Sequence, residues 1–95
     1  MSKKQIVLFT MEGCPWCSDM KKMLQEENIE FLDRNINQYE DEYKMFVEIT
    51  ENDFVPAFMI INDINDLSKT KLYAPERDFD GIEEGVKIIK ESFKK

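Results

Sequence analysis

The stretch "QIVLFTMEGCPWCSDMKKMLQEEN", residues 5–28, predicts a strand, a short turn and a helix in direct succession. Residues 5–10 form a continuous apolar run rich in β-branched side chains, which is typical of a strand buried on both faces. Strong helix formers follow from residue 18, and Cys17, Met20 and Leu24 fall on one stripe of that helix. The only two cysteines of the chain therefore stand where the strand gives way to the helix.

The rest of the chain continues this alternation. We expect a second strand over residues 29–36, a third over 55–61 and a hairpin partner over 70–74, with the polar turn 62–69 before the last. Two further helices are indicated by apolar side chains at helical spacing: Tyr39, Tyr43, Phe46, Val47 and Thr50 in one, and Ile82, Val86, Ile89 and Phe93 in the other. Asp80, with Glu83 three residues on, is expected to cap the last helix in an arrangement close to a capping box.

The order β-α-β-α-β-β-α predicts an α/β fold, in which a four-stranded mixed sheet is flanked by three helices. A chain of 95 residues is the size of one small domain, so we expect a single domain over residues 1–95. The polypeptide shows no internal repeat and no low-complexity stretch.

Composition excludes several classes of function. The net charge of −7 argues against a nucleic-acid partner, and no basic cluster favours an anionic membrane surface. No apolar run approaches the roughly 18 residues of a membrane span, and the run after the first lysines is too short for a signal peptide. We therefore expect a cytoplasmic protein. The absence of histidine excludes a Ser-His-Asp triad, a Cys-His pair and imidazole ligands for zinc.

The spacing of the cysteines gives the two thiols different environments. Pro15 fits the first turn of a helix because its φ is fixed and it lacks an N–H. Cys14 then lies at the helix N-terminus, where the dipole and free N–H groups favour a thiolate. Cys17 lies one turn inside on the apolar stripe and should be buried and protonated. One thiol attacks and the other resolves, which is what thiol–disulfide exchange requires.

Three other interpretations of the pair are less consistent with the sequence. Two buried cysteines can fall at this spacing by chance. A zinc site needs four ligands, so with two cysteines and no histidine it would have to be shared between two chains; we expect no metal. A structural disulfide would close too short a loop to stabilise much. A C-x-x-C pair beside a βαβ pattern favours redox chemistry.

A strand ending in Phe9-Thr10, then "GCPWC" opening a helix, then "FVPAFMII" as the third strand, resembles a glutaredoxin of the thioredoxin superfamily. The "CPWC" motif is close to the usual C-P-Y-C of that family. The resemblance implies a thioredoxin-like fold and a cis bond before Pro56. It also implies no tightly bound cofactor, glutathione as reductant or co-substrate, and protein disulfides or glutathione mixed disulfides as substrates. Ribonucleotide reductase is a possible electron acceptor, and we expect a monomer.

The candidate site residues follow from the motif and the resemblance. Cys14 and Cys17 are the expected catalytic pair. The resemblance places Pro15, Trp16, Val55, Pro56 and Asp80 at the substrate: the backbone beside Pro56 pairs with the substrate disulfide, and Asp80 engages the γ-glutamyl end of glutathione. Trp16, between the two cysteines, is expected to face solvent and to contact the substrate.

The chain departs from the family where glutathione is recognised. Met11 replaces a lysine, Phe54 replaces a threonine, and Arg77 and Asp78 replace a pair of glycines. Glu12 and Asp19 add negative charge beside the cysteines and oppose an anionic ligand; Lys21, Lys22 and Arg77 are candidates to compensate.

These departures leave three alternatives open. The first is a thioredoxin-like reductant recharged by a flavoprotein reductase. The second is an iron–sulfur-bridged dimer held through Cys14, against which Pro15 counts. The third is a non-catalytic domain that kept the fold.

Overall fold

The computed structural model describes residues 4–63 and 65–93. Its elements in chain order are β1 (Gln5–Thr10), α1 (Pro15–Glu26), β2 (Leu32–Asn35), α2 (Glu40–Thr50), β3 (Ala57–Ile61), β4 (Thr70–Tyr73) and α3 (Ile82–Ser92), with a short 3₁₀ helix, η1 (Leu67–Lys69), before β4. This is the predicted α/β order, and three helices on a four-stranded mixed sheet make the thioredoxin-like fold. Within the described ranges, no helix combines the length and the apolar character needed to cross a membrane.

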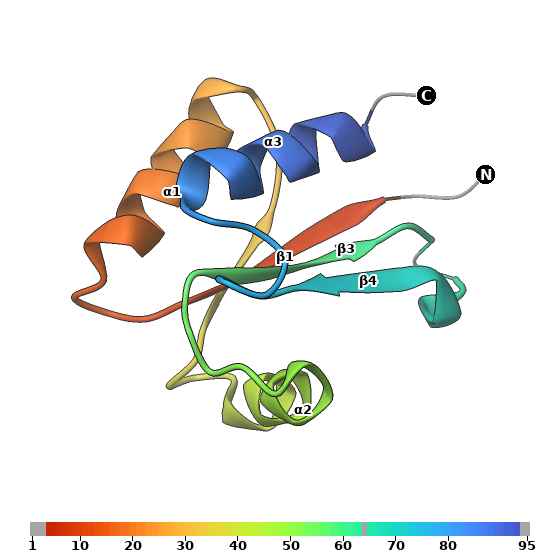
Figure 1. Cartoon of the computed structure of the whole chain (residues 1–95). Helices are drawn as coiled ribbons and strands as arrows, with labels where there is room; N and C mark the ends of the chain where they lie inside the picture. The colour runs from red at the N-terminus through yellow and green to blue at the C-terminus, as the bar shows by residue number, and fades with distance from the viewer. Residues whose placement is uncertain (1–3, 64, 94–95) are drawn as a thin grey trace.

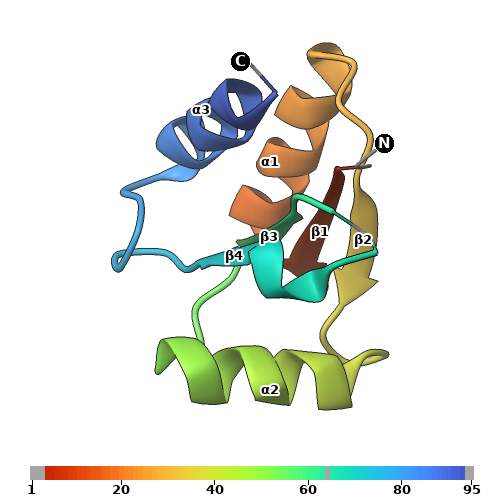
Figure 2. The same cartoon turned by 90° about the vertical axis from the view of Figure 1, so that its right-hand side faces the viewer.

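The sheet has the strand order β2-β1-β3-β4. β1 runs parallel to β2 and antiparallel to β3, and β3 and β4 form an antiparallel hairpin. Figures 1 and 2 show α1 and α3 side by side on one face of the sheet and α2 on the other face. The molecule therefore has three layers, with β1 and β3 at the centre of the sheet.

The two faces of β1 explain why its sequence is apolar from Ile6 to Phe9. Ile6 and Leu8 are fully buried in the cluster that α1 and α3 cover. Val7 and Phe9 belong to the cluster on the α2 side, where the Phe9 ring lies 5.1 Å from that of Phe46. Because neighbouring strand residues point to opposite faces, a strand covered by helices on both sides buries its central side chains on both faces.

Helices α1 and α3 approach each other closely at Gly85. A Cβ atom at this position would lie 3.1 Å from the Cε of Met20 on α1 and 3.2 Å from the ring of Phe79. Glycine in the middle of a helix costs about 0.5–1 kcal/mol relative to alanine, so its presence here is explained by packing.

Several element boundaries differ from the sequence-based predictions. β2 begins at Leu32 rather than at residue 29, and β3 begins at Ala57, directly after Pro56, which has no N–H to give to a ladder. The predicted Asp80 cap is wrong: α3 begins at Ile82 with Gly81 at the N-cap, and no side chain caps it. Gly81 has a φ of 83°, so the chain turns between Asp80 and the helix.

Candidate active site

The turn into α1, the segment leading into β3 and the loop before α3 meet at one end of the sheet, on the left in Figure 1. The strand registers require this meeting. Phe9 near the end of β1 pairs with Ala57 at the start of β3, and Phe58 pairs with Tyr73 at the end of β4. The cysteines, Pro56 and residues 74–81 are therefore brought together from three separate parts of the sequence.

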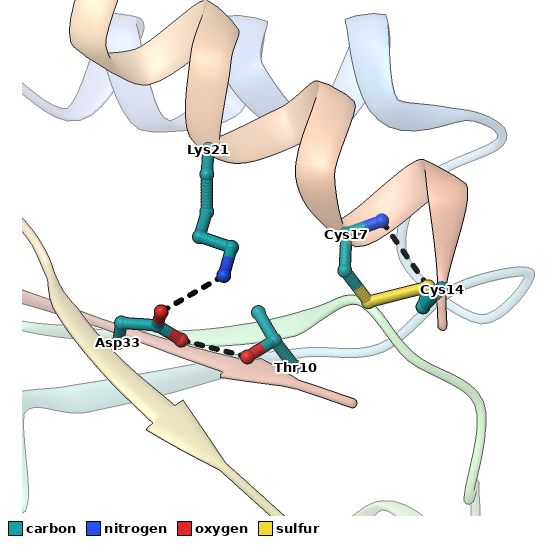
Figure 3. Close-up of a disulfide and its surroundings, with 5 residues drawn as sticks. All are labelled: Thr10, Cys14, Cys17, Lys21 and Asp33. Atoms are coloured by element: carbon teal, nitrogen blue, oxygen red, sulfur yellow. Dashed lines mark hydrogen bonds and ion pairs between the residues drawn. A yellow bond between two sulfur atoms is a disulfide. The ribbon is translucent and has the colours of Figure 1, made fainter. Parts of the chain in front are cut away.

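The cysteine pair lies where the sequence predicts it. Gly13 has a φ of 76°, which lets the chain reverse after β1, and Cys14 is the N-cap of α1 with Pro15 in its first turn. The Cα atoms of Cys14 and Cys17 are 5.3 Å apart and the two residues form a disulfide, shown in Figure 3. The Cys17 backbone N–H donates a hydrogen bond to Cys14 Sγ, with 3.1 Å between nitrogen and sulfur.

The two sulfurs differ in their surroundings. Cys14 Sγ accepts the N–H at the start of a helix, where partial positive charge accumulates and a thiolate is favoured. Cys17 is only 2% exposed and lies on the buried stripe of α1 with Met20 and Leu24, whereas Cys14 is 8% exposed. The arrangement suits one sulfur that reacts at the surface and one that stays behind it.

The segment before β3 passes beside the disulfide. The Val55–Pro56 peptide bond is cis, as the resemblance implied, and Pro56 is buried. In the described part of the chain, the Val55 N–H and carbonyl take part in no hydrogen bond. A free backbone N–H and carbonyl at the mouth of a strand are the groups that pair with an extended peptide.

A groove of about 380 Å³ begins next to the cysteines. Trp16 lines it together with Phe54, Val55 and Pro56 from the segment before β3, and the loop before α3 contributes Glu76 and Phe79 among others. Trp16 is 64% exposed, in agreement with its predicted outward position, and Phe54 is 51% exposed. Asp80 is exposed and does not line the groove, although its chain neighbours Phe79 and Gly81 do.

Asn52 is a residue of this region that sequence reasoning missed. Its side-chain amide donates to the Pro75 carbonyl (2.7 Å), and its Oδ1 accepts the Phe54 N–H (2.9 Å). It thus ties together the two segments that line the groove. The only sequence signal was an asparagine in the turn after a helix, which is common in turns of any kind.

A polar network lies at the end of β1 below α1. The Asp33 carboxylate accepts hydrogen bonds from Thr10 Oγ1 (2.7 Å) and Lys21 Nζ (2.9 Å), and Figure 3 shows Lys21 and Cys17 projecting from the same side of α1. Burial alone would raise the pKa of Asp33, but the hydrogen bonds from Thr10 and Lys21 and the Lys21 charge outweigh it and hold that pKa below its ordinary value.

Two of the cations expected to compensate for glutathione's charges are therefore engaged within the protein. Lys21 pairs with Asp33, and the Arg77 guanidinium pairs with Asp78 at 2.8 Å. Lys22 is exposed on α1. Over residues 4–63 and 65–93, no three His, Cys, Asp or Glu side chains lie close enough together to hold a metal ion.

Comparison with known proteins identifies a matching protein family. The family model described as Glutaredoxin matches residues 6–63, which is more than half of the chain. The matched segment runs from β1 to just beyond β3 and includes both cysteines and the Val55–Pro56 bond. No curated protein matches the chain.

Proposed function

The chain belongs to the glutaredoxin family, and on that premise we propose that it is a dithiol oxidoreductase that reduces protein disulfides or glutathione mixed disulfides through Cys14 and Cys17. Family membership supports thiol–disulfide exchange in general. The observation that carries the dithiol mechanism is the N-cap position of Cys14, whose sulfur accepts the Cys17 N–H while Cys17 is buried behind it.

The first step is attack by the Cys14 thiolate on one sulfur of a substrate disulfide. A bond forms between Cys14 Sγ and that sulfur, the substrate S–S bond breaks, and the other substrate sulfur leaves as a thiolate that takes up a proton. The Cys17 N–H lowers the energy of the attacking thiolate by donating to it. Pro15 assists by starting the helix directly after Cys14.

The second step releases the product. Cys17 gives its proton to solvent and attacks Cys14 Sγ, the mixed disulfide breaks, and the second substrate sulfur leaves as a thiolate and is protonated. The substrate has gained two electrons and two protons, and the enzyme holds the Cys14–Cys17 disulfide seen in the structure. Two thiols of a reductant reverse the change in the enzyme and become a disulfide themselves.

The substrate is positioned by the remaining site residues. We assign the free Val55 N–H and carbonyl, beside the cis Pro56, to backbone pairing with the segment that carries the substrate disulfide. Trp16 supplies an exposed apolar surface between the two cysteines. We propose that the Asp80 carboxylate binds the amino group of a γ-glutamyl ligand from the edge of the groove, since Asp80 does not line the groove itself.

Glutathione is the proposed reductant, as is general in the family. The second candidate is a flavoprotein reductase, and it is favoured by the pairing of Lys21 and Arg77 with neighbouring carboxylates. Supplying the oxidised protein with each electron source in turn, and following NADPH consumption, separates the two.

The physiological setting is proposed from the same chemistry. A reducing dithiol works where thiols are kept reduced, which supports a cytoplasmic protein. We propose a single-domain monomer that acts on disulfide-containing proteins, with ribonucleotide reductase as one possible acceptor of electrons, and without a resident metal, a nucleic-acid partner or a membrane partner.

The roles of the two cysteines are tested by trapping. We expect Cys17→Ser to accumulate a mixed disulfide between Cys14 and a disulfide substrate, because the second step is then blocked. Cys14→Ser should form no such adduct, since Cys17 is 2% exposed. Mass spectrometry of the intact protein after acid quenching gives the result, and an adduct on Cys14→Ser alone would reverse the assignment.

A further inference from the structure

Exposed apolar side chains are concentrated around the disulfide. In the part of the chain that the structure describes, three of the six large apolar side chains that face solvent belong to the segments next to the cysteines: Met11 (43%), Trp16 (64%) and Phe54 (51%). Met11 is held there because its carbonyl accepts the Cys14 N–H. Apolar side chains gathered at one place on a soluble protein mark a surface that binds a partner.

The groove continues this surface. Trp16 and Phe54 line it together with Pro56 and the buried Phe79. Its volume of about 380 Å³ is within the range of roughly 300–1,000 Å³ typical of ligand sites. The lining therefore suits apolar side chains that reach it from a segment bound at Cys14.

Hydrogen bonds within the protein fix the segments that line the groove. Asn52 bonds to both of its sides, to Pro75 and to Phe54. Tyr43 on α2 donates from its hydroxyl to the Asp53 carbonyl (2.7 Å), and the Glu76 N–H donates to the Phe79 carbonyl (2.8 Å). A site formed before binding loses less entropy when a partner is ordered in it.

The charge around the groove is negative. Glu76 is its only charged lining residue among those described. Asp53, Asp80 and Glu83 are exposed and each is next in the chain to a lining residue, while the nearby Arg77 is paired with Asp78. Glutathione carries two carboxylates and one amino group. The negative rim of the groove repels the two carboxylates and attracts only the amino group.

We infer that the groove and the apolar side chains at its mouth bind a protein segment in which the reacting cysteine is flanked by an apolar residue and by lysine or arginine. The inference rests on the proposed function and names the substrate class of the same site. The apolar side chain enters between Trp16 and Phe54, and the basic side chain meets Glu76 and its acidic neighbours.

The test is the rate at which the reduced protein is oxidised by symmetric peptide disulfides. The peptides carry Leu-Cys-Lys, Leu-Cys-Glu or Ser-Cys-Lys at their centre, and oxidised glutathione is the fourth substrate. Each rate is divided by the rate at which dithiothreitol reduces the same compound, which removes differences in intrinsic reactivity. We expect Leu-Cys-Lys to exceed Leu-Cys-Glu and oxidised glutathione by about tenfold, which is about 1.4 kcal/mol.

Two substitutions make the test specific. Glu76→Lys should reverse the order of Leu-Cys-Lys and Leu-Cys-Glu, which is a gain that misfolding cannot produce. Phe54→Ser should remove the difference between Leu-Cys-Lys and Ser-Cys-Lys. The matched controls lie on α2: Ile49→Ser removes another exposed apolar side chain (63%), and Glu48→Lys makes the same charge change. Both should keep the preferences of the unmodified protein.

Bis(2-hydroxyethyl) disulfide, which is small and neutral, distinguishes a failure of the oxidoreductase activity from a failure of the groove's substrate preference. If the reduced protein does not react with it or with any peptide, the proposed function fails. If it reacts with all substrates at similar normalised rates, or prefers oxidised glutathione, the oxidoreductase stands and the inference about the groove is overturned.

Discussion

Asp33 shows how one carboxylate connects three elements at the back of the site. It belongs to β2, and it accepts from Thr10 at the end of β1 and from Lys21 on α1. The Thr10 side chain is 3% exposed, so its hydroxyl needs an acceptor inside the protein. The ion pair itself is partly exposed, with 31% and 43% of the two side chains accessible, and so contributes modestly.

A stability measurement tests this residue. Asp33→Asn keeps an acceptor for Thr10 and removes the charge, so we expect a loss of about 0.5 kcal/mol at pH 7. Because the pKa of Asp33 is lowered by folding, its contribution is present above the pKa of the unfolded chain and is lost as the pH falls through the folded value. Urea unfolding should therefore show a difference between variant and unmodified protein at pH 7 and none at about pH 2.

The control for this measurement is Glu48→Gln, an exposed carboxylate on α2. It should match the unmodified protein at pH 7. A difference for Asp33→Asn that persists at about pH 2 would show that the substitution disturbs packing rather than charge.

At the scale of the elements, Gly85 sets how closely α3 packs on α1. Gly85→Val would place atoms against Met20 and Phe79, which are both buried. Overpacking of this kind costs about 1–3 kcal/mol, and we expect the midpoint of urea unfolding to fall accordingly. Gly81→Ala is a contrasting variant, because nothing lies within 4 Å of its Cβ position and only the φ of 83° opposes it.

The Gly85 variant also has a consequence for the site. Phe79 lines the groove and touches the Gly85 position, so displacing it should reduce the preference for apolar peptides. The rate with bis(2-hydroxyethyl) disulfide should change less, since the atoms nearest to the Gly85 Cβ position belong to Met20 and Phe79 and not to the cysteines at the start of α1. An unchanged unfolding midpoint would contradict the packing argument.

The elements differ in how far their sequences predict them. β1 was predictable from the apolar run within residues 5–10, and α1 from the stripe of Cys17, Met20 and Leu24. Both elements are buried on at least one face, and burial leaves a clear pattern of apolar residues in a sequence. The Asp80 cap was wrong because a capping box and a turn at Gly81 share the same residues, and only the backbone conformation distinguishes them. Phe93, predicted on one helical face with Ile82, Val86 and Ile89, is 50% exposed because it follows the last residue of α3.

The sequence predicts some residues of the site but not the groove. Cys14, Cys17 and Pro56 are marked by motifs within a few residues. The groove is not, because it is formed by Trp16 on α1, the segment before β3 and the loop before α3, and these three parts of the chain meet only through the strand register. The sequence marks Phe54 only as a departure from the family pattern, and the fold shows that this side chain is exposed and lines the groove.

At the scale of the whole molecule, the net charge of −7 affects the rate at which charged substrates associate with the protein. A charged partner is steered over distances comparable with the Debye length, about 10 Å at 0.1 M salt. We expect the rate with Leu-Cys-Lys disulfides to fall by about threefold between 0.02 and 0.5 M NaCl, and that with Leu-Cys-Glu to rise. The neutral bis(2-hydroxyethyl) disulfide is the control, and a parallel change in all three would exclude charge as the cause.

The same overall arrangement leaves one end of the protein free for attachment. The start of β1 and the end of α3 lie together at the right of Figure 1, opposite the turn that leads into α1. Lys4 joins them by donating to the Ser92 carbonyl and lying 5.3 Å from the centre of the Phe93 ring. A fusion partner, an affinity tag or a solid support joined next to Lys4 or Ser92 would be attached at the end of the sheet away from the turn that holds Cys14. The domain can therefore be immobilised or built into a larger polypeptide with its dithiol still facing incoming substrates.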